Sequence, residues 1–132
     1  MNEINPRVCV GNIPFNASCQ TLIMAGYVEH IEGYDPVTGW RTFKKNDEME
    51  IYVRDDAVVC IACFRECAIN GVSLIGMTPS ELIAQVGDPD EIGEAIWVSD
   101  DAQQTPYEYF SLGLQVWIES CRVISVFCNA IY

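Results

Sequence analysis

The stretch that decides the fold is QVWIE at residues 115–119, in which polar and apolar side chains alternate. EIYVR at residues 50–54 repeats this alternation 65 positions earlier. At the same shift of 65 positions, VISVFC at residues 123–128 falls on VVCIAC at residues 58–63. A period of two is typical of a strand with one buried face. Each copy therefore predicts a hairpin.

A short helix is expected ahead of each hairpin. LIMAG at residues 22–26 matches IAQVG at residues 83–87 at a shift of 61 positions. The glycine that ends each stretch is typical of a helix C-terminus. Asn16 or Ser18 can cap the first helix. TPSE at residues 78–81 predicts a capping box with proline at the first helical position.

We therefore expect an α+β fold in one domain over residues 1–132, made of two tandem units at residues 8–69 and 70–132. Each unit would be a helix followed by an antiparallel meander, and the two would form one mostly antiparallel sheet with helices on one face. The alternation assigns one set of apolar side chains to the helix-covered core: Met49, Ile51, Val53, Val59, Ile61, Cys63, Leu114, Val116, Ile118, Ile124, Val126 and Cys128.

Charge limits the classes of partner. The chain has a formal net charge of −12, and its half from residue 70 onward carries nine carboxylates and one base, Arg122. Such a surface repels the phosphates of nucleic acids and attracts a basic protein. The start of the chain lacks a basic segment followed by an apolar run, and no apolar stretch reaches the length of a membrane span. We expect a cytoplasmic protein without a membrane or nucleic-acid partner.

The chain has seven cysteines, an odd number that cannot pair completely. In a reducing compartment we expect thiols that pack as small apolar residues. Cys60, Cys63 and Cys67 have a spacing like that of a metal site, but residues three apart on a strand point to opposite faces. We therefore expect no metal and no cofactor. A cysteine-based metal or redox protein stays open as an alternative.

Two groups of residues are candidates for partner binding. The open face of the sheet would carry Tyr52 and Trp117 at matching repeat positions, flanked by Glu50 and Glu119, and aromatic side chains of this kind dominate binding hot spots. Loops of the second unit add further acids: Asp88, Asp90, Glu91, Asp100 and Asp101. The alternatives are that the aromatics form a second small core and that the acids are a solvated edge. No hydrolase, zinc-protease, phosphate-loop or dinucleotide motif is present, so we do not expect an enzyme.

GMTPSEL at residues 76–82, followed by VGDPD at residues 86–90, resembles the signature of the BamE family of small outer-membrane lipoproteins. That unit is a helical element on a three-stranded meander. A tandem arrangement of it is similar to the β-lactamase inhibitor proteins, which grip their target with a concave sheet face. In size and acidity the chain also resembles the cytoplasmic immunity proteins of contact-dependent growth inhibition systems.

These resemblances imply an immunity or inhibitor protein. It would bind a basic toxin domain, expected to be a nuclease, and neutralise it by covering the active site and matching its charge. The alternative is a BamE-like assembly or interaction module without a toxin partner. The sequence leaves open whether the chain is a monomer or a dimer.

Overall fold

The computed structural model describes residues 2–130, so residues 1, 131 and 132 of the expected domain lie outside the described residues. The chain is mostly β, with 52% of residues in strands and 13% in helices. The strands form two sheets rather than one. The expected α+β fold, a single sheet with helices on one face, is therefore wrong.

The larger sheet is entirely antiparallel, in the order β10-β12-β13-β14-β7-β6-β5-β4, with β11 also paired to β12. Its two halves meet where β14 pairs with β7. The strands are β4 (Val28–Asp35), β5 (Trp40–Lys44), β6 (Met49–Arg54), β7 (Ala57–Cys63), β10 (Glu91–Ile92), β11 (Ile96–Ser99), β12 (Ala102–Tyr109), β13 (Leu114–Glu119) and β14 (Arg122–Asn129). A 3₁₀ turn, η1 (Phe110–Leu112), joins β12 to β13.

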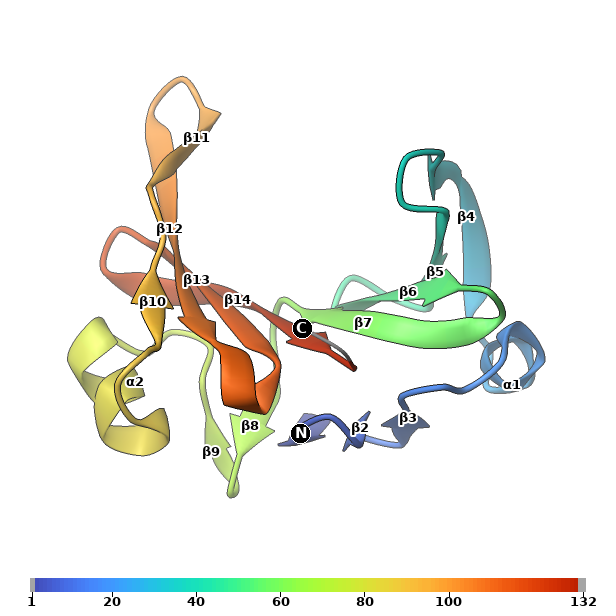
Figure 1. Cartoon of the computed structure of the whole chain (residues 1–132), viewed down its shortest axis with the longest axis horizontal. Helices are drawn as coiled ribbons and strands as arrows, with labels where there is room; N and C mark the ends of the chain where they lie inside the picture. The colour runs from blue at the N-terminus through green and yellow to red at the C-terminus, as the bar shows by residue number, and fades with distance from the viewer. Residues whose placement is uncertain (1, 131–132) are drawn as a thin grey trace.

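The smaller sheet explains why the expected architecture fails. It consists of β1 (Asn2–Asn5), β2 (Cys9–Val10), β3 (Ile13–Pro14), β8 (Cys67–Ile69) and β9 (Val72–Ser73). It lies beneath the middle of the larger sheet, between α1 (Cys19–Met24) and α2 (Pro79–Val86) (Figure 1). The two helices have six and eight residues. Helices this short cover only part of this face. Strands from the N-terminal segment and from the link between the two units cover the rest.

The helix starts follow from their caps. The Ser18 side chain accepts a hydrogen bond from the backbone of Thr21, and Thr78 and Glu81 form the expected capping box. The buried leucines of the helices, Leu22 and Leu82, are both 0% exposed. They are 60 positions apart, so the expected shift of 61 positions paired Leu22 with the wrong residue of α2.

The junction of the two halves has an internal symmetry. Ala62 pairs with Phe127, and on either side Cys63 pairs with Val126 and Ile61 pairs with Cys128. Residues 61 and 126 are 65 positions apart, as are residues 63 and 128. Equivalent residues of the two halves thus exchange places across the junction, which puts a local two-fold axis between Ala62 and Phe127.

A β-bulge recurs at equivalent places in the two hairpins. The register shifts between Tyr52 and Val53 in one hairpin and between Trp117 and Ile118 in the other. The extra residues are Val59 and Ile124, which are only half-buried. Their assignment to the core is wrong, because a bulge interrupts the alternation on which it depended.

The rest of the predicted core is confirmed, since the other side chains assigned to it are all buried. They form one cluster with Ile4, Val10 and Ile13 of the smaller sheet and with Leu22 and Leu82 of the helices. Among the helices of residues 2–130, none is long and apolar enough to cross a membrane.

The turn between β13 and β14 offers a test of backbone strain. Cys121 is exposed and has φ of 61°, a left-handed conformation that costs a residue with a Cβ atom roughly 1–2 kcal/mol. We expect Cys121→Gly to raise the free energy of unfolding in urea by up to about 1 kcal/mol, after the entropy that glycine adds to the unfolded chain. Cys121→Ala is the control, because it removes the thiol and keeps the Cβ atom. An equal gain in both variants would contradict a backbone origin.

Candidate functional site

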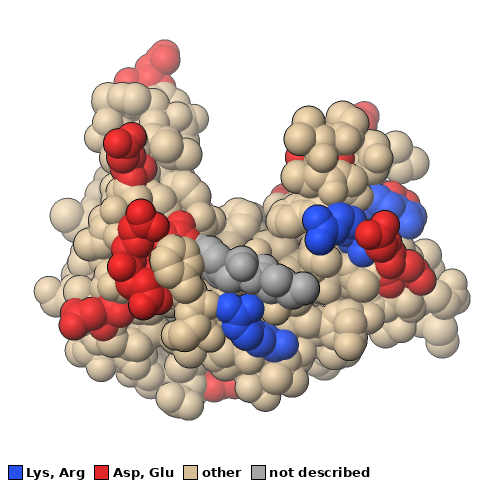
Figure 2. All heavy atoms as spheres, in the orientation of Figure 1, with Lys and Arg blue, Asp and Glu red and all other residues tan. Residues whose placement is uncertain are grey.

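The larger sheet has a concave open face on the side away from the helices. β6, β7, β13 and β14 form its floor, and two arms rise from it, the β11–β12 hairpin and the β4–β5 hairpin (Figure 1). In the space-filling view a cleft separates the two arms (Figure 2). This concave face, floor and arms together, is the candidate functional site.

Tyr52 and Trp117 lie on the floor at equivalent positions, and each donates a hydrogen bond to the side chain two residues before it. The Tyr52 hydroxyl donates to Glu50 Oε2 at 2.5 Å. The Trp117 indole Nε1 donates to Gln115 Oε1 at 3.0 Å. The same side-chain arrangement therefore orients one ring in each half of the floor.

A row of aromatic rings crosses the junction between the halves. Tyr52 is 5.4 Å from Trp40 and 6.4 Å from Phe127, measured between ring centroids, and it is nearly parallel to Phe127. Phe64 meets Phe127 edge-on, also at 6.4 Å. The Trp40 indole N–H is buried and has no hydrogen-bond partner among the described residues. These rings, each next to another in the row, give the floor an apolar strip.

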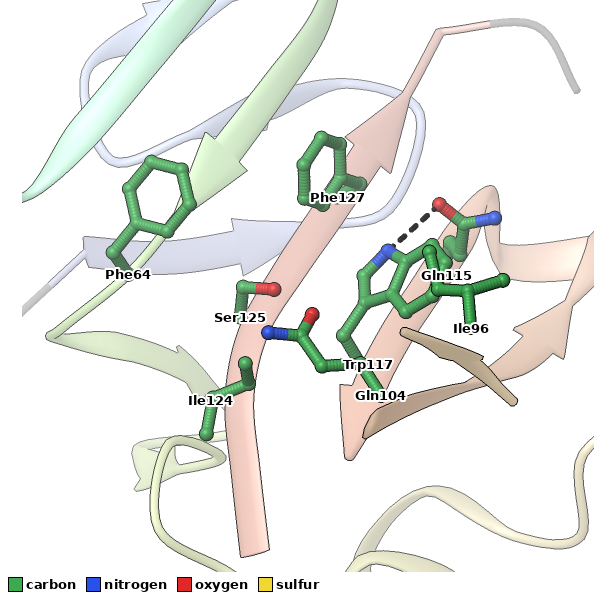
Figure 3. Close-up of a pocket in the computed structure, with 8 residues that line it drawn as sticks. All are labelled: Phe64, Ile96, Gln104, Gln115, Trp117, Ile124, Ser125 and Phe127. Carbon is green, nitrogen blue, oxygen red and sulfur yellow. Dashed lines mark hydrogen bonds between the residues drawn. The ribbon is translucent and has the colours of Figure 1, made fainter. Parts of the chain in front are cut away.

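A pocket of about 410 Å³ opens beside this row, beneath the β11–β12 arm. Trp117 and Phe127 face into it from the floor, and Ile96 closes it from the arm (Figure 3). Ile124 reaches the pocket because the bulge in β14 turns it out of the core. The remaining lining residues are Phe64, Gln104, Gln115 and Ser125. The pocket is therefore apolar, with amide and hydroxyl groups at a few points.

The charges on the two sides of the floor differ. In the first half, Glu50 is 3.0 Å from Lys44 Nζ. Partial burial opposes ionisation of Glu50, but hydrogen bonds from Tyr52 and Lys44 outweigh it and lower the pKa of the carboxyl group. Burial, followed by the hydrogen bond to Glu50, raises the pKa of Tyr52. Here the negative charge has a cation beside it.

The second half has carboxylates held by amides instead. Gln115 Nε2 donates to Glu108 Oε1 at 2.7 Å, and Gln104 Nε2 donates to Glu119 Oε1 at 3.1 Å. Amides satisfy the hydrogen-bonding capacity of a carboxylate without cancelling its charge. This side of the concave face therefore keeps its negative potential.

The nine predicted binding residues fall into three groups. Glu50, Tyr52, Trp117 and Glu119 share the floor. Asp100 and Asp101 lie at the turn of the β11–β12 arm, where Asp101 accepts a hydrogen bond from Ser99. The third group lies at the outer edge of the sheet, in the link from α2 to β10 and at the first residue of β10: Asp88, Asp90 and Glu91. Asp90 accepts a hydrogen bond from the backbone N–H of Phe110.

The apolar side chains on the arms were not among the predicted site residues. On β11, Trp97 is 66% exposed, and Ile96 and Val98 beside it are also exposed. The β4–β5 arm carries a second exposed set: Val28, Ile31, Tyr34 and Val37. The available signal was the run IWV at residues 96–98, which is apolar without alternation and so has no polar face to turn to solvent.

Scans against family models, curated proteins and solved structures find no match to this chain. The resemblances to the BamE family, to β-lactamase inhibitor proteins and to immunity proteins stay predictions.

The Tyr52–Glu50 pair predicts a pH-dependent contribution to stability. Because the pKa of Glu50 is lowered in the folded protein, its ionised form stabilises the fold above the ordinary value of 4.5, and this is lost as the pH falls through the folded pKa. We expect Tyr52→Phe to lower the free energy of unfolding by about 1–2 kcal/mol at pH 7 and by less at pH 3, measured in urea.

Trp117→Phe is the matched control, since it removes the equivalent donor, whose acceptor Gln115 is neutral. Its cost is expected to change less between the two pH values than that of Tyr52→Phe. Equal pH dependence in the two variants would contradict the role given to Glu50.

Proposed function

We propose that this chain is an inhibitor of the immunity type, which holds a basic toxin domain in its concave face in the cytoplasm. The observation that carries the proposal is the aromatic floor between two arms, on a molecule with a net charge of −12. A partner seated there would have its own functional surface covered.

The shape supports a protein partner. Aromatic anchors in a partly enclosed centre, ringed by residues that exclude water, are typical of protein-binding hot spots. Both arms also carry several exposed large apolar side chains, and gathered apolar surface marks interaction sites. A protruding loop or helix of the partner would contact the floor with its tip and the arms with its flanks.

The distribution of charge supports a basic partner. Arg41 pairs with Glu29 at 2.6 Å, and the Arg7 guanidinium donates to backbone carbonyl groups, so these cations of the first half are engaged within the chain. In the second half, Asp88, Glu91, Glu94 and Asp100 form no salt bridge with any described residue. Figure 2 shows this acidic surface on the β11–β12 side. A nuclease toxin matches it, because a nucleic-acid site is itself basic.

The exposed apolar side chains of the arms favour a second candidate, an assembly module that binds a neutral partner. The two functions differ in their response to salt. Capture of a basic toxin predicts an association rate that falls steeply as salt rises, whereas an apolar interface predicts a rate that changes little.

The first test is co-expression with basic toxin domains encoded beside the gene for this chain, followed by growth assays and stopped-flow association at low and high salt. We expect one domain to form a stoichiometric complex and to lose its toxicity. Association with weak salt dependence and no protection of growth would instead support the assembly module.

Variants of the concave face locate the interface. We expect Trp117→Ala to weaken binding of the toxin domain at least about 30-fold, as loss of a hot-spot anchor of about 2 kcal/mol would. The double variant Asp100→Lys/Asp101→Lys is expected to slow association chiefly at low salt. Affinities and rates would be measured by surface plasmon resonance.

Asp88→Lys/Glu91→Lys is the matched control, because it makes the same change in net charge at the outer edge of the sheet. Slower association in the control than in Asp100→Lys/Asp101→Lys would move the interface to that edge. Unchanged affinity in Trp117→Ala would exclude the floor.

A further inference from the structure

Three cysteines meet on the core side of the sheet junction. The Sγ atoms of Cys63, Cys67 and Cys128 all lie within 4.8 Å of one another. Each side chain is at most 1% exposed. Cys60 is equally buried but pairs with Tyr52, on the side of the open face. The cluster is thus a distinct group of three sulfurs.

The three sulfurs come from three parts of the fold. Cys63 ends β7 in the first half of the larger sheet, Cys128 lies on β14 in the second half, and Cys67 begins β8 of the smaller sheet. Cys63 and Cys128 are equivalent residues across the local two-fold axis. The link from Cys63 to Cys67 reaches solvent at Arg65 and Glu66, which are exposed.

We propose that Cys63, Cys67 and Cys128 form a three-sulfur site for a single Cu(I) ion, which would join the two halves of the larger sheet to the smaller sheet. Metal–sulfur bonds of about 2.3 Å in a trigonal arrangement need sulfurs about 4 Å apart, a spacing that the cluster reaches with small side-chain movements. Cysteine sulfur is a soft ligand that selects Cu(I).

The number of ligands favours Cu(I) over zinc. Structural zinc takes four protein ligands. Within the described residues, the group of ligand atoms contains these three cysteines and no histidine or carboxylate. The site is also closed to bulk water, which removes the usual source of a fourth ligand. Met49, the buried neighbour of Cys63 on β6, has a thioether that suits Cu(I) as well.

Binding at this site exchanges thiol protons for the ion. Because cysteine ligates metals as the thiolate, Cu(I) binds by displacing the thiol protons of its ligands, which leave to solvent. No oxidation or reduction is involved.

The proposal is independent of the proposed function and is tested on the purified full chain with Cu(I) alone. Cu(I) would be added anaerobically, with reductant, in competition with a colorimetric chelator. We expect one equivalent to bind and to raise the melting temperature, since a ligand of the folded state stabilises it. Cys67→Ser and Cys128→Ser are each expected to lose more than the roughly 100-fold in affinity that loss of an outer-shell partner costs.

Cys60→Ser is the matched control, because the equivalent residue in the second half of the chain, Ser125, is itself a buried serine. It is expected to bind Cu(I) like the wild type. Cys9→Ser/Cys121→Ser removes the thiols that are not buried and is expected to retain the tight equivalent. Circular dichroism would establish that each variant folds. Failure of the wild type to take Cu(I) from the chelator, or equal loss in Cys60→Ser, would overturn the proposal.

Discussion

The pairing of β7 with β14 is the constraint on which the rest of this structure depends. It joins two similar hairpins edge to edge around Ala62 and Phe127. The register of this pairing determines which side chains lie on each face of the sheet. The local symmetry is broken at its centre, where one half has a methyl group and the other a phenyl ring. The small side chain of Ala62 therefore leaves room for Phe127 to lie beside Tyr52 and to continue the aromatic row.

The same register serves two different chemistries. On the open face it completes the row of aromatic rings across the floor, which suits recognition of a protein. On the core face it brings Cys63 and Cys128 to the local axis, where Cys67 joins them from the smaller sheet. Carboxylates are distributed unequally over this symmetric frame. Lys44 neutralises Glu50 in one half, while amides hold Glu108 and Glu119 in the other, so the two arms present different potentials to a partner.

Local patterns predicted local features well. The alternation in residues 49–53 and 114–118 identified the buried side chains, and the capping signal at Thr78 identified the start of α2. It also placed Tyr52 and Trp117 on one open face. The prediction was wrong at Val59 and Ile124, because a bulge inserts a residue and reverses the alternation beyond it. It was also wrong about the architecture, since very short strands such as β2, β3 and β9 carry almost no periodic signal.

The sequence by itself determined which side chains of β6 and β13 are buried, where α2 begins, and that one half of the chain is strongly acidic. These properties depend on neighbours within a few residues, where backbone geometry alone relates one side chain to the next. Only the tertiary structure decided that Asp88 lies at the outer edge of the sheet and Asp100 at the turn of the β11–β12 arm. It also decided that Trp97 is exposed and that three cysteines from distant segments form one cluster. Those relations depend on how distant segments pair, and the register between β7 and β14 that sets them is a property of the packed sheet rather than of either strand alone.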